Sequence, residues 1–498
     1  MEEKLKELKE YIGEINRLNE ISNVLYWDMT TYMPEEGLES RADIIEYLSG
    51  EVFSKITSSK VKEYLDFFGD KMDDLDDVNK AMIKKLSKEY NETMKIPKDK
   101  YKAFVSLCSK SEKAWEEAKE KGDYYIFKPH LEKVIKYKKE FINYWGYKGN
   151  KYNALLEQYE PGITVEILDT LFGELKKEII KLLNEIKKSD VTIDNSMFKG
   201  QFNIEEQKKL SMEVINKIGF DLNKGRLDES VHPYTIEFSS KDVRITTNYH
   251  EDDITYALYS SIHEAGHGIY EQNISEKLKD TGLMTGVSMG IHESQSRMYE
   301  NILCRSYEFL VYLLPVINKH FHQFNNVRIE EFYKAINKVT PSLIRTEADE
   351  LTYSLHIIIR YEIEKAIFND EVTVDELPYL WNKKYKEYLG IEPKNDKEGI
   401  LQDLHWADGS FGYFPSYALG NIYGAQIIHK FLKDDPKILE SLKEGDFQKI
   451  NKKLKETIHV YGSVYEPKDL IKKATNEELN IKYYVQYLRN KYSNIYSL

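Results

Sequence analysis

The sequence predicts a mostly α-helical protein with one small β-sheet element near residues 233–250. Apolar residues recur at helical spacing from Leu5 to Leu18 and again from Leu351 to Ile359, whereas strand signals concentrate near residues 233–250. Glycine and proline are scarce, with 25 and 12 residues among 498, and no linker divides the chain. We therefore expect one large multi-helix domain, residues 1–498, or two helical subdomains that flank a cleft.

The expected sheet element is a β-hairpin. Residues 234–238 and 243–249 are rich in β-branched and aromatic residues that alternate with polar ones, and residues 239–242 join them. Arg244 lies in the second strand and has two open interpretations. It lines a substrate groove whose strand edge bonds a peptide backbone, or it is a surface arginine paired with Asp242 or Glu237.

An amphipathic helix is expected to follow from Ile254. Its apolar face consists of Ile254, Leu258, Ile262, Ala265 and Ile269, and a mostly polar stripe beside it consists of Tyr256, Ser260, His263, His267 and Tyr270. His263 and His267 lie one turn apart and can bind one zinc ion, while Glu264 can contact a metal-bound water. The pattern predicts two ligands and a base. The alternative is a buried helix whose histidines only hydrogen-bond to their neighbours.

The third ligand is expected from the next helical run. Glu293 lies 26 residues after His267, at the start of a segment with helical apolar spacing, and Gly282 and Gly286 allow the chain to turn back. Catalytic zinc sites often combine two histidines with one carboxylate. We therefore predict one divalent metal per chain, zinc or alternatively cobalt. The competing interpretation of Glu293 is an intrahelical ion-pair ladder with Arg297 and Glu300.

Short motifs along the chain occur in an order that resembles the carboxypeptidase Taq family of metallocarboxypeptidases. The similarity extends from residues 25–34 to residues 487–498, so it covers essentially the full length. One departure is Tyr234, where that family usually has phenylalanine. The motifs are His232-Pro233-Tyr234, Asp242-Val-Arg244-Ile-Thr246, His263-Glu264-Ala-Gly-His267, His292-Glu293-Ser294-Gln295, Ile344-Arg345-Thr-Glu-Ala348-Asp349 and Gly399-Ile-Leu-Gln402-Asp403-Leu-His405-Trp406.

This resemblance implies a zinc- or cobalt-dependent homodimer that removes single residues from the free C-terminus of peptides, with a central active-site groove. Such an enzyme must bind the terminal carboxylate, and arginine does so with two parallel hydrogen bonds. Arg244 and Arg345 are the candidates because both lie in motifs of the resemblance. Arg345 and Asp349 are also expected to form an intrahelical salt bridge, because they are four residues apart in a helical run.

Several further residues are candidates for the catalytic and substrate sites. His405 is expected to donate to the developing oxyanion, and Tyr417, preferred to Tyr413, is expected to be a second donor. Tyr413 and His232 are expected to line the substrate groove. The competing interpretations are structural, because 38 tyrosines place one near any site and His232 precedes a proline that favours an extended turn.

Composition restricts the partners and the compartment. A net charge of −13 and a pI near 5.6 disfavour nucleic acid and anionic membranes as partners. We find no apolar signal core and no membrane-spanning stretch, and Cys108 and Cys304 match neither a disulfide framework nor a thiolate metal site. A cytoplasmic protein is therefore expected.

Three functions remain in view. The first is a C-terminal exopeptidase that uses Glu264 as the general base. The second is an oligopeptidase or a dipeptidyl carboxypeptidase with the same metal chemistry and a longer groove. The third is a non-catalytic, zinc-containing helical binding protein, and Glu264 disfavours it because a structural zinc site needs no base.

Overall fold

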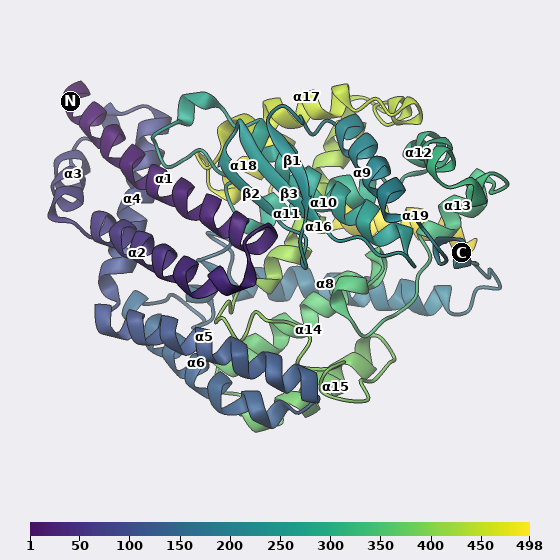
Figure 1. Cartoon of the computed structure of the whole chain (residues 1–498), viewed down its shortest axis with the longest axis horizontal. Coiled ribbons are helices and arrows are strands. Elements are labelled where there is room, and N and C mark those ends of the chain that lie inside the picture. The colour runs from purple at the N-terminus through teal and green to yellow at the C-terminus, as the bar shows by residue number, and fades with distance from the viewer.

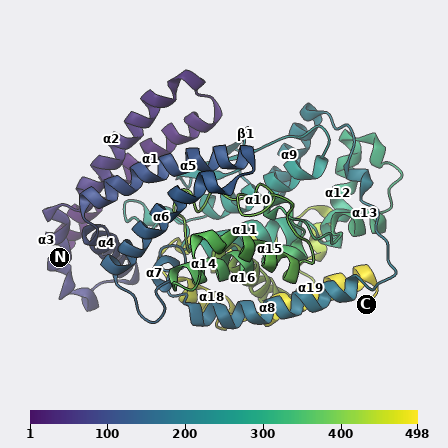
Figure 2. The same cartoon turned by 90° about the horizontal axis from the view of Figure 1, so that it is seen from below.

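The computed structural model describes residues 1–498 and is dominated by helices (Figure 1). The N-terminal helices form one side of the molecule, where α1 packs along α2 and α5 packs along α6 (Figure 2). Their bounds are α1 Glu2–Thr31, α2 Leu38–Ile56, α3 Ser59–Gly69, α4 Asp77–Lys95, α5 Lys98–Lys121 and α6 Tyr124–Trp145.

The centre of the molecule consists of helices that are buried on most or all sides. One of them, α11 (Met289–Arg297), continues directly into a π-helical stretch at residues 298–303. Side chains fix where these helices begin: Asp253, Ser288 and Asp349 accept hydrogen bonds from backbone N–H groups of the first turns of α10, α11 and α14. The bounds are α10 Ile254–Gln272, α11 Met289–Arg297, α14 Glu350–Phe368 and α16 Phe414–Asp434.

A row of polar side chains runs along the helix α14, which is buried except at Glu362 and Lys365. His356, Arg360 and Glu364 are spaced four residues apart and none of them is exposed to solvent. Such spacing places them on one face of the helix. His356 and Arg360 bond to the hydroxyl of Tyr385, and Glu364 accepts a bond from Trp406 Nε1 at 2.7 Å. This face therefore holds the loop that leads into α16.

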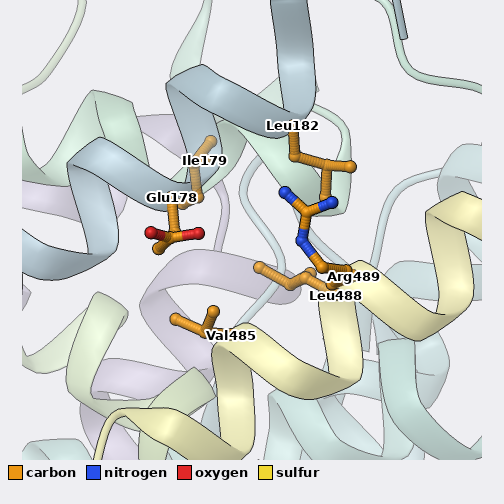
Figure 3. A pocket seen from close by; sticks show the side chains of 6 residues that line it. All are labelled: Glu178, Ile179, Leu182, Val485, Leu488 and Arg489. Carbon is orange, nitrogen blue, oxygen red and sulfur yellow. The ribbon is translucent and has the colours of Figure 1, made fainter. Parts of the chain in front are cut away.

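The remaining helices surround this centre. α8 and α19 lie along one edge of the molecule in Figure 2 and pack against each other. Figure 3 shows a shallow depression between them, where Arg489 reaches across toward α8. The bounds are α7 Asn153–Leu156, α8 Val165–Ile186, α9 Ile204–Ile218, α12 Tyr307–His320, α13 Ile329–Ile336, α15 Leu377–Tyr388, α17 Gln448–Thr457, α18 Pro467–Thr475 and α19 Lys482–Tyr496.

One small sheet lies beside α10 in the order β1-β3-β2. β2 (Thr235–Ser239) and β3 (Asp242–Thr247) form the predicted antiparallel hairpin, and β1 (Gly225–Glu229) pairs in parallel with β3. β1 was not predicted, because its residues lack the β-branched alternation that marked the other two strands. α10 packs on one face of the sheet and α1 packs against β2.

The predicted fold class is confirmed: the chain is mostly helical with one small sheet. One hydrophobic cluster includes residues from Leu8 in α1 to Tyr496 in α19. No helix combines the length and the apolar content that a bilayer crossing would need.

Candidate metal centre and substrate site

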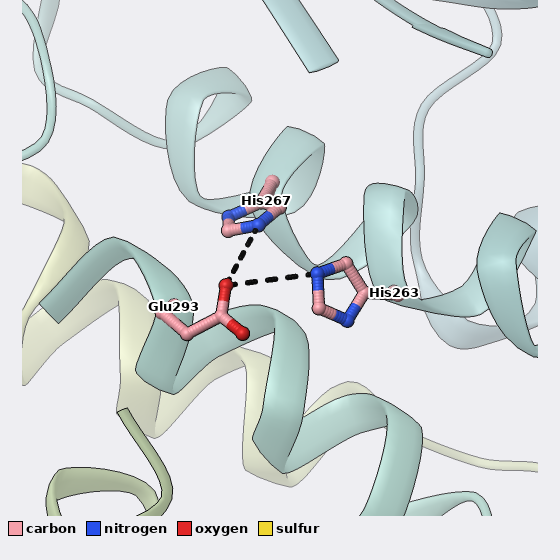
Figure 4. Close-up of side chains that lie close together, drawn as sticks. All are labelled: His263, His267 and Glu293. Atoms are coloured by element: carbon pink, nitrogen blue, oxygen red, sulfur yellow. Dashed lines mark ion pairs between the residues drawn. The ribbon is translucent and has the colours of Figure 1, made fainter. Parts of the chain in front are cut away.

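The structure brings the three predicted metal ligands together. His263 and His267 lie one turn apart on α10, and Glu293 faces them from α11 (Figure 4). Their ligand atoms all lie within 4.8 Å of one another, and Glu293 Oε2 is 3.6 Å from His263 Nε2 and 3.5 Å from His267 Nε2. Ligands that each sit about 2.1 Å from one ion have separations of this size. Two imidazoles and a carboxylate with converging atoms therefore fit a divalent metal.

Glycines on both sides of α11 allow this approach. A Cβ atom at Gly266 of α10 would lie 2.8 Å from the Ser296 Cα atom, and one at Gly420 of α16 would lie 2.6 Å from the Glu293 Cγ atom. Real Cβ atoms do not come so close to other heavy atoms. α10 and α16 can therefore enclose α11 only because these two positions lack a side chain.

The ring nitrogens that face away from the metal centre are also engaged. His263 Nδ1 lies 2.9 Å from Glu300 Oε2, and His267 Nδ1 lies 2.5 Å from His292 Nδ1. His292 Nε2 in turn lies 2.8 Å from Glu271 Oε1. When each Nδ1 of His263 and His267 donates its proton to these partners, each Nε2 keeps a free lone pair for a metal. These roles of Glu300, His292 and Glu271 were not predicted from the sequence.

The two ligand histidines differ in charge before a metal binds. Burial alone lowers the pKa of His263, but Glu293 and Glu300 outweigh it and raise the pKa to about 9. Burial and the neighbouring histidines His292 and His263 lower the pKa of His267 to about 3. A metal must therefore displace a proton from His263, so metal binding weakens as the pH falls.

Glu264 lies beside the triad and is held by the sheet. It is 7% exposed, and the hydroxyl of Thr235 in β2 donates to its Oε2 atom at 2.6 Å. Burial raises the pKa of Glu264, and Glu293 adds to this, whereas His263 and Thr235 lower it. A carboxylate with a raised pKa is a better proton acceptor than an exposed one. Thr235 was not identified from the sequence; its position in the strand before the zinc-motif helix was the available signal.

Arg345 lies in a buried charge cluster. Its Nε atom donates to Asp403 Oδ1 at 2.9 Å, and Arg360 Nη2 lies 2.6 Å from Asp403 Oδ2. Gln402 Oε1 accepts hydrogen bonds from the Arg345 backbone N–H and from Arg360 Nη2. One carboxylate therefore serves two guanidinium groups, which leaves an excess of one positive charge.

The prediction of an intrahelical salt bridge between Arg345 and Asp349 is wrong. Arg345 belongs to a short 3-10 turn that ends at Glu347, and the chain extends at Ala348 before α14 begins. Asp349 is the cap of α14 and accepts from the Thr352 N–H at 2.9 Å. The two residues are therefore not on one helix, and the counter-ion of Arg345 comes from Asp403 instead.

His405 and two tyrosines lie next to this cluster. His405 Nε2 is 3.2 Å from Tyr417 Oη, and the rings of Tyr413 and Tyr417 meet edge to face at 5.0 Å. The Arg345 guanidinium lies 4.9 Å from the centre of the Tyr417 ring. Burial and the two arginines outweigh Asp403 and lower the pKa of His405 to about 4, so its imidazole is neutral at pH 7. His405, Tyr417, Tyr413 and Arg345 thus form one group.

Arg244 and His232 form no hydrogen bond or ion pair with these groups. Strand register places Arg244 on the sheet face opposite Ile245, whose side chain approaches α10 at Gly268. Arg244 bonds both carboxylate oxygens of Asp242 and stacks on Trp27 of α1 at 4.3 Å. His232 is exposed, and its side chain makes no hydrogen bond or ion pair with the metal ligands. Neither residue therefore contacts the three metal ligands.

Comparisons with known proteins agree over the whole chain. Residues 7–492 match the family model described as Carboxypeptidase Taq (M32) metallopeptidase. The chain is 49% identical to carboxypeptidase 1 of Bacillus subtilis over 99% of both chains, and 35% identical to thermostable carboxypeptidase 1 of Pyrococcus furiosus over 98% of both. It resembles a solved structure of Pyrococcus furiosus carboxypeptidase with a TM-score of 0.96, at 35% identity over 98% of this chain and 99% of that one. An M32 carboxypeptidase from Deinococcus radiodurans gives 0.95, at 31% identity over 99% of this chain and all of that one.

Proposed function

The chain belongs to the carboxypeptidase Taq (M32) family and is a metallocarboxypeptidase, and we propose that it removes single residues from the free C-terminus of peptides with broad side-chain tolerance. The observation that carries this proposal is the convergence of three metal-binding atoms beside the carboxylate of Glu264. The buried cluster of Arg345, Arg360 and Asp403 supports it further, because its unbalanced positive charge suits the terminal carboxylate of a peptide.

His263, His267 and Glu293 are proposed as the ligands of one zinc ion, with cobalt as the alternative. The donor set of two imidazoles and one carboxylate supports both metals. A divalent metal at this site supplies a Lewis acid that polarises a peptide carbonyl and acidifies water. Glu300 and the His292–Glu271 pair keep both imidazoles oriented, with Nε2 toward Glu293.

Glu264 is proposed as the general base. It accepts a proton from the attacking water and passes that proton to the nitrogen of the leaving amino acid. Its burial supports this role because burial raises the pKa of the carboxylate. The bond from Thr235 supports it because that bond fixes one carboxylate oxygen while the other is free.

Arg345 is proposed to bind the terminal carboxylate of the peptide. Asp403 balances only one of the two guanidinium groups of Arg345 and Arg360, so a substrate carboxylate would neutralise the remaining charge. Arg244 supports this role less well. Both of the carboxylate oxygens of Asp242 already bind it, and it lies across the sheet from α10.

His405 and Tyr417 are proposed to donate hydrogen bonds to the oxygen that becomes negative during hydrolysis. The neutral imidazole of His405 supports this role, because a neutral ring can present one N–H donor. Its 3.2 Å contact with Tyr417 places both donors together. Tyr413, which packs against both rings, is proposed to line the substrate site.

Mass spectrometry of peptides after incubation with metal-loaded and chelated protein tests the proposal. We expect a ladder that shortens one residue at a time from the free C-terminus, and we expect amidation or chelation to abolish it. Loss of dipeptides or internal cleavage would instead assign an oligopeptidase or a dipeptidyl carboxypeptidase. No cleavage with metal bound would favour a non-catalytic zinc protein.

We further propose that residues 1–498 form one catalytic domain that assembles as a homodimer in the cytoplasm. One hydrophobic core that includes both ends of the chain supports a single domain. Six exposed apolar side chains belong to α1 and α2 and support a partner surface on these helices: Ile21, Val24, Tyr26, Leu38, Ile44 and Tyr47. Both cysteines are free and buried, in agreement with a reducing compartment. Light scattering of the purified protein tests the dimer.

A further inference from the structure

β2 is an edge strand that lies directly beside the proposed general base. The sheet order β1-β3-β2 leaves one long side of β2 without a partner strand. The hydroxyl of Thr235 in β2 bonds both the carboxylate and the backbone carbonyl of Glu264. A chain that paired with this free side would therefore run past the catalytic carboxylate.

The direction of the backbone groups of β2 follows from its pairing with β3. The Thr246 N–H donates to the Tyr234 carbonyl at 2.9 Å, so residues 234 and 246 form a hydrogen-bonded pair of the antiparallel ladder. Bonded and non-bonded pairs alternate in such a ladder. Thr235 and Glu237 occupy the non-bonded positions, and their N–H and C=O groups point away from β3.

One of these outward groups is already occupied. Asn23 of α1 donates from Nδ2 to the carbonyl of Glu237 at 3.1 Å. The outward N–H and C=O of Thr235 have no protein partner, and both Thr235 and Glu237 are only half-buried. Neighbouring contacts hold α1 in place, since Trp27 stacks on Arg244 and Thr30 bonds the hydroxyl of Tyr234. The unpaired edge of β2 therefore ends at the Glu237 carbonyl, where the side-chain amide of Asn23 is bound.

We propose that the peptide substrate pairs with the free edge of β2 at Thr235, and that Asn23 determines how many peptide residues this pairing includes. The inference rests on the proposed carboxypeptidase function and adds the determinant of substrate length. Thr235 would accept one peptide N–H and donate to one peptide carbonyl. The next peptide N–H along the edge would need the Glu237 carbonyl, and Asn23 holds that position.

The affinity for peptides should therefore stop increasing once the peptide reaches a defined number of residues. Edge pairing adds bonds at every second residue of the bound strand. A peptide that extends beyond Glu237 reaches a carbonyl whose outward position the Asn23 amide already occupies. An asparagine that only protects a sheet edge against aggregation would have no such effect on peptide length.

A length series measured on two variants tests the proposal. Peptides with a common C-terminal segment are lengthened one residue at a time toward the N-terminus, and kcat/KM is measured for wild type, Asn23→Ala and the control Asn19→Ala. Asn19 is exposed and lies one turn earlier on α1. We expect a plateau in wild type and in the control. In Asn23→Ala, we expect one further step of about fivefold, the worth of one hydrogen bond.

Backbone-methylated peptides locate the bonds. N-methylation of the amide that meets Thr235 should weaken binding in all proteins, whereas N-methylation two residues further should weaken it only in Asn23→Ala. Calorimetry on each variant combined with Glu264→Gln measures the same length dependence without turnover, so a failure of the proposed reaction is distinguishable from a failure of this inference. A plateau that is unchanged in Asn23→Ala, or N-methyl effects that do not alternate, would overturn the inference.

Discussion

Glu293 and Gly420 are packed so closely that a Cβ atom at position 420 would lie 2.6 Å from Cγ and 2.8 Å from Cβ of Glu293. We expect Gly420→Ala to push α16 from α11, to cost roughly 1–3 kcal/mol of unfolding free energy and to weaken zinc binding. Gly173 in the middle of α8 has no atom within 4 Å of an added Cβ. Gly173→Ala should therefore stabilise by about 0.5–1 kcal/mol with unchanged zinc affinity. Urea unfolding and zinc titration measure both; equal effects from the two substitutions would contradict the prediction.

Glu264→Gln should retain metal and lose turnover by roughly 10²- to 10⁴-fold, because glutamine accepts no proton. The amide keeps the size of the side chain and still accepts the bond from Thr235. Metal content by elemental analysis and peptide hydrolysis by mass spectrometry check the two parts. Substantial activity with metal bound would exclude Glu264 as the base.

His292→Phe should weaken zinc affinity about 10- to 100-fold, because His267 loses the partner of its Nδ1 atom while an aromatic ring remains at position 292. His320→Phe is the control, since His320 pairs with Glu206 and Glu213 on α9. Competition with a zinc chelator measures both affinities. If the two variants bind zinc equally well, His292 does not orient His267.

Arg345→Lys should raise KM for peptides with a free C-terminus at least tenfold, because lysine keeps the charge but cannot form two parallel bonds. Arg244→Lys is the matched control, because Arg244 lies on the other face of the sheet. Steady-state kinetics with one peptide series measures both. A larger rise in the Arg244 variant would move the carboxylate site to the sheet.

Stability should fall as the pH rises from about 4.5 to 7, in part because of Glu364. Burial raises its pKa from an ordinary 4.5 to about 7, although Tyr152, Gly412 and Trp406 donate to it. The folded state therefore binds the proton more tightly than the unfolded state, and stability present below pH 4.5 is lost as the pH passes 7. This contribution amounts to roughly 3 kcal/mol.

Urea unfolding of wild type and Glu364→Gln at several pH values checks this dependence. The unfolding free energy of wild type minus that of the variant should fall as the pH rises, because only wild type carries the titrating carboxyl group. Glu160, whose pKa burial also raises to about 7, titrates in the same direction and keeps part of the dependence in the variant. A difference that does not change with pH would show that Glu364 keeps its ordinary pKa.

Local patterns in the sequence were sufficient for the helical class, the hairpin and the three converging ligands. The histidine pair follows from helix periodicity, and Glu293 follows from a second helical run after a glycine-containing turn. In contrast, the pairing of Arg345 with Asp403 joins segments 58 residues apart, and no periodicity encodes it. The salt bridge with Asp349 failed because a helix boundary falls between the two residues, and Asp349 itself is a typical N-cap.

Residues that orient the site were missed for a related reason. Thr235 was recognised only as part of a strand, because its contact with Glu264 depends on how the sheet docks on α10. Glu300 was considered only as part of an ion-pair ladder, although it lies in the π-helical stretch after α11 and pairs with His263. Both depend on tertiary packing between elements, which a single sequence does not specify.

The buried polar row on α14 restricts how this helix can be aligned. His356, Arg360 and Glu364 meet their partners together, so sliding or rotating α14 by one residue would strand all three groups in an apolar interior at once. Purely apolar faces tolerate such shifts far better. The row therefore allows only one register of α14 against its neighbours. Because Glu364 bonds Trp406 and Gly412, that register also determines the position of His405 in the same loop.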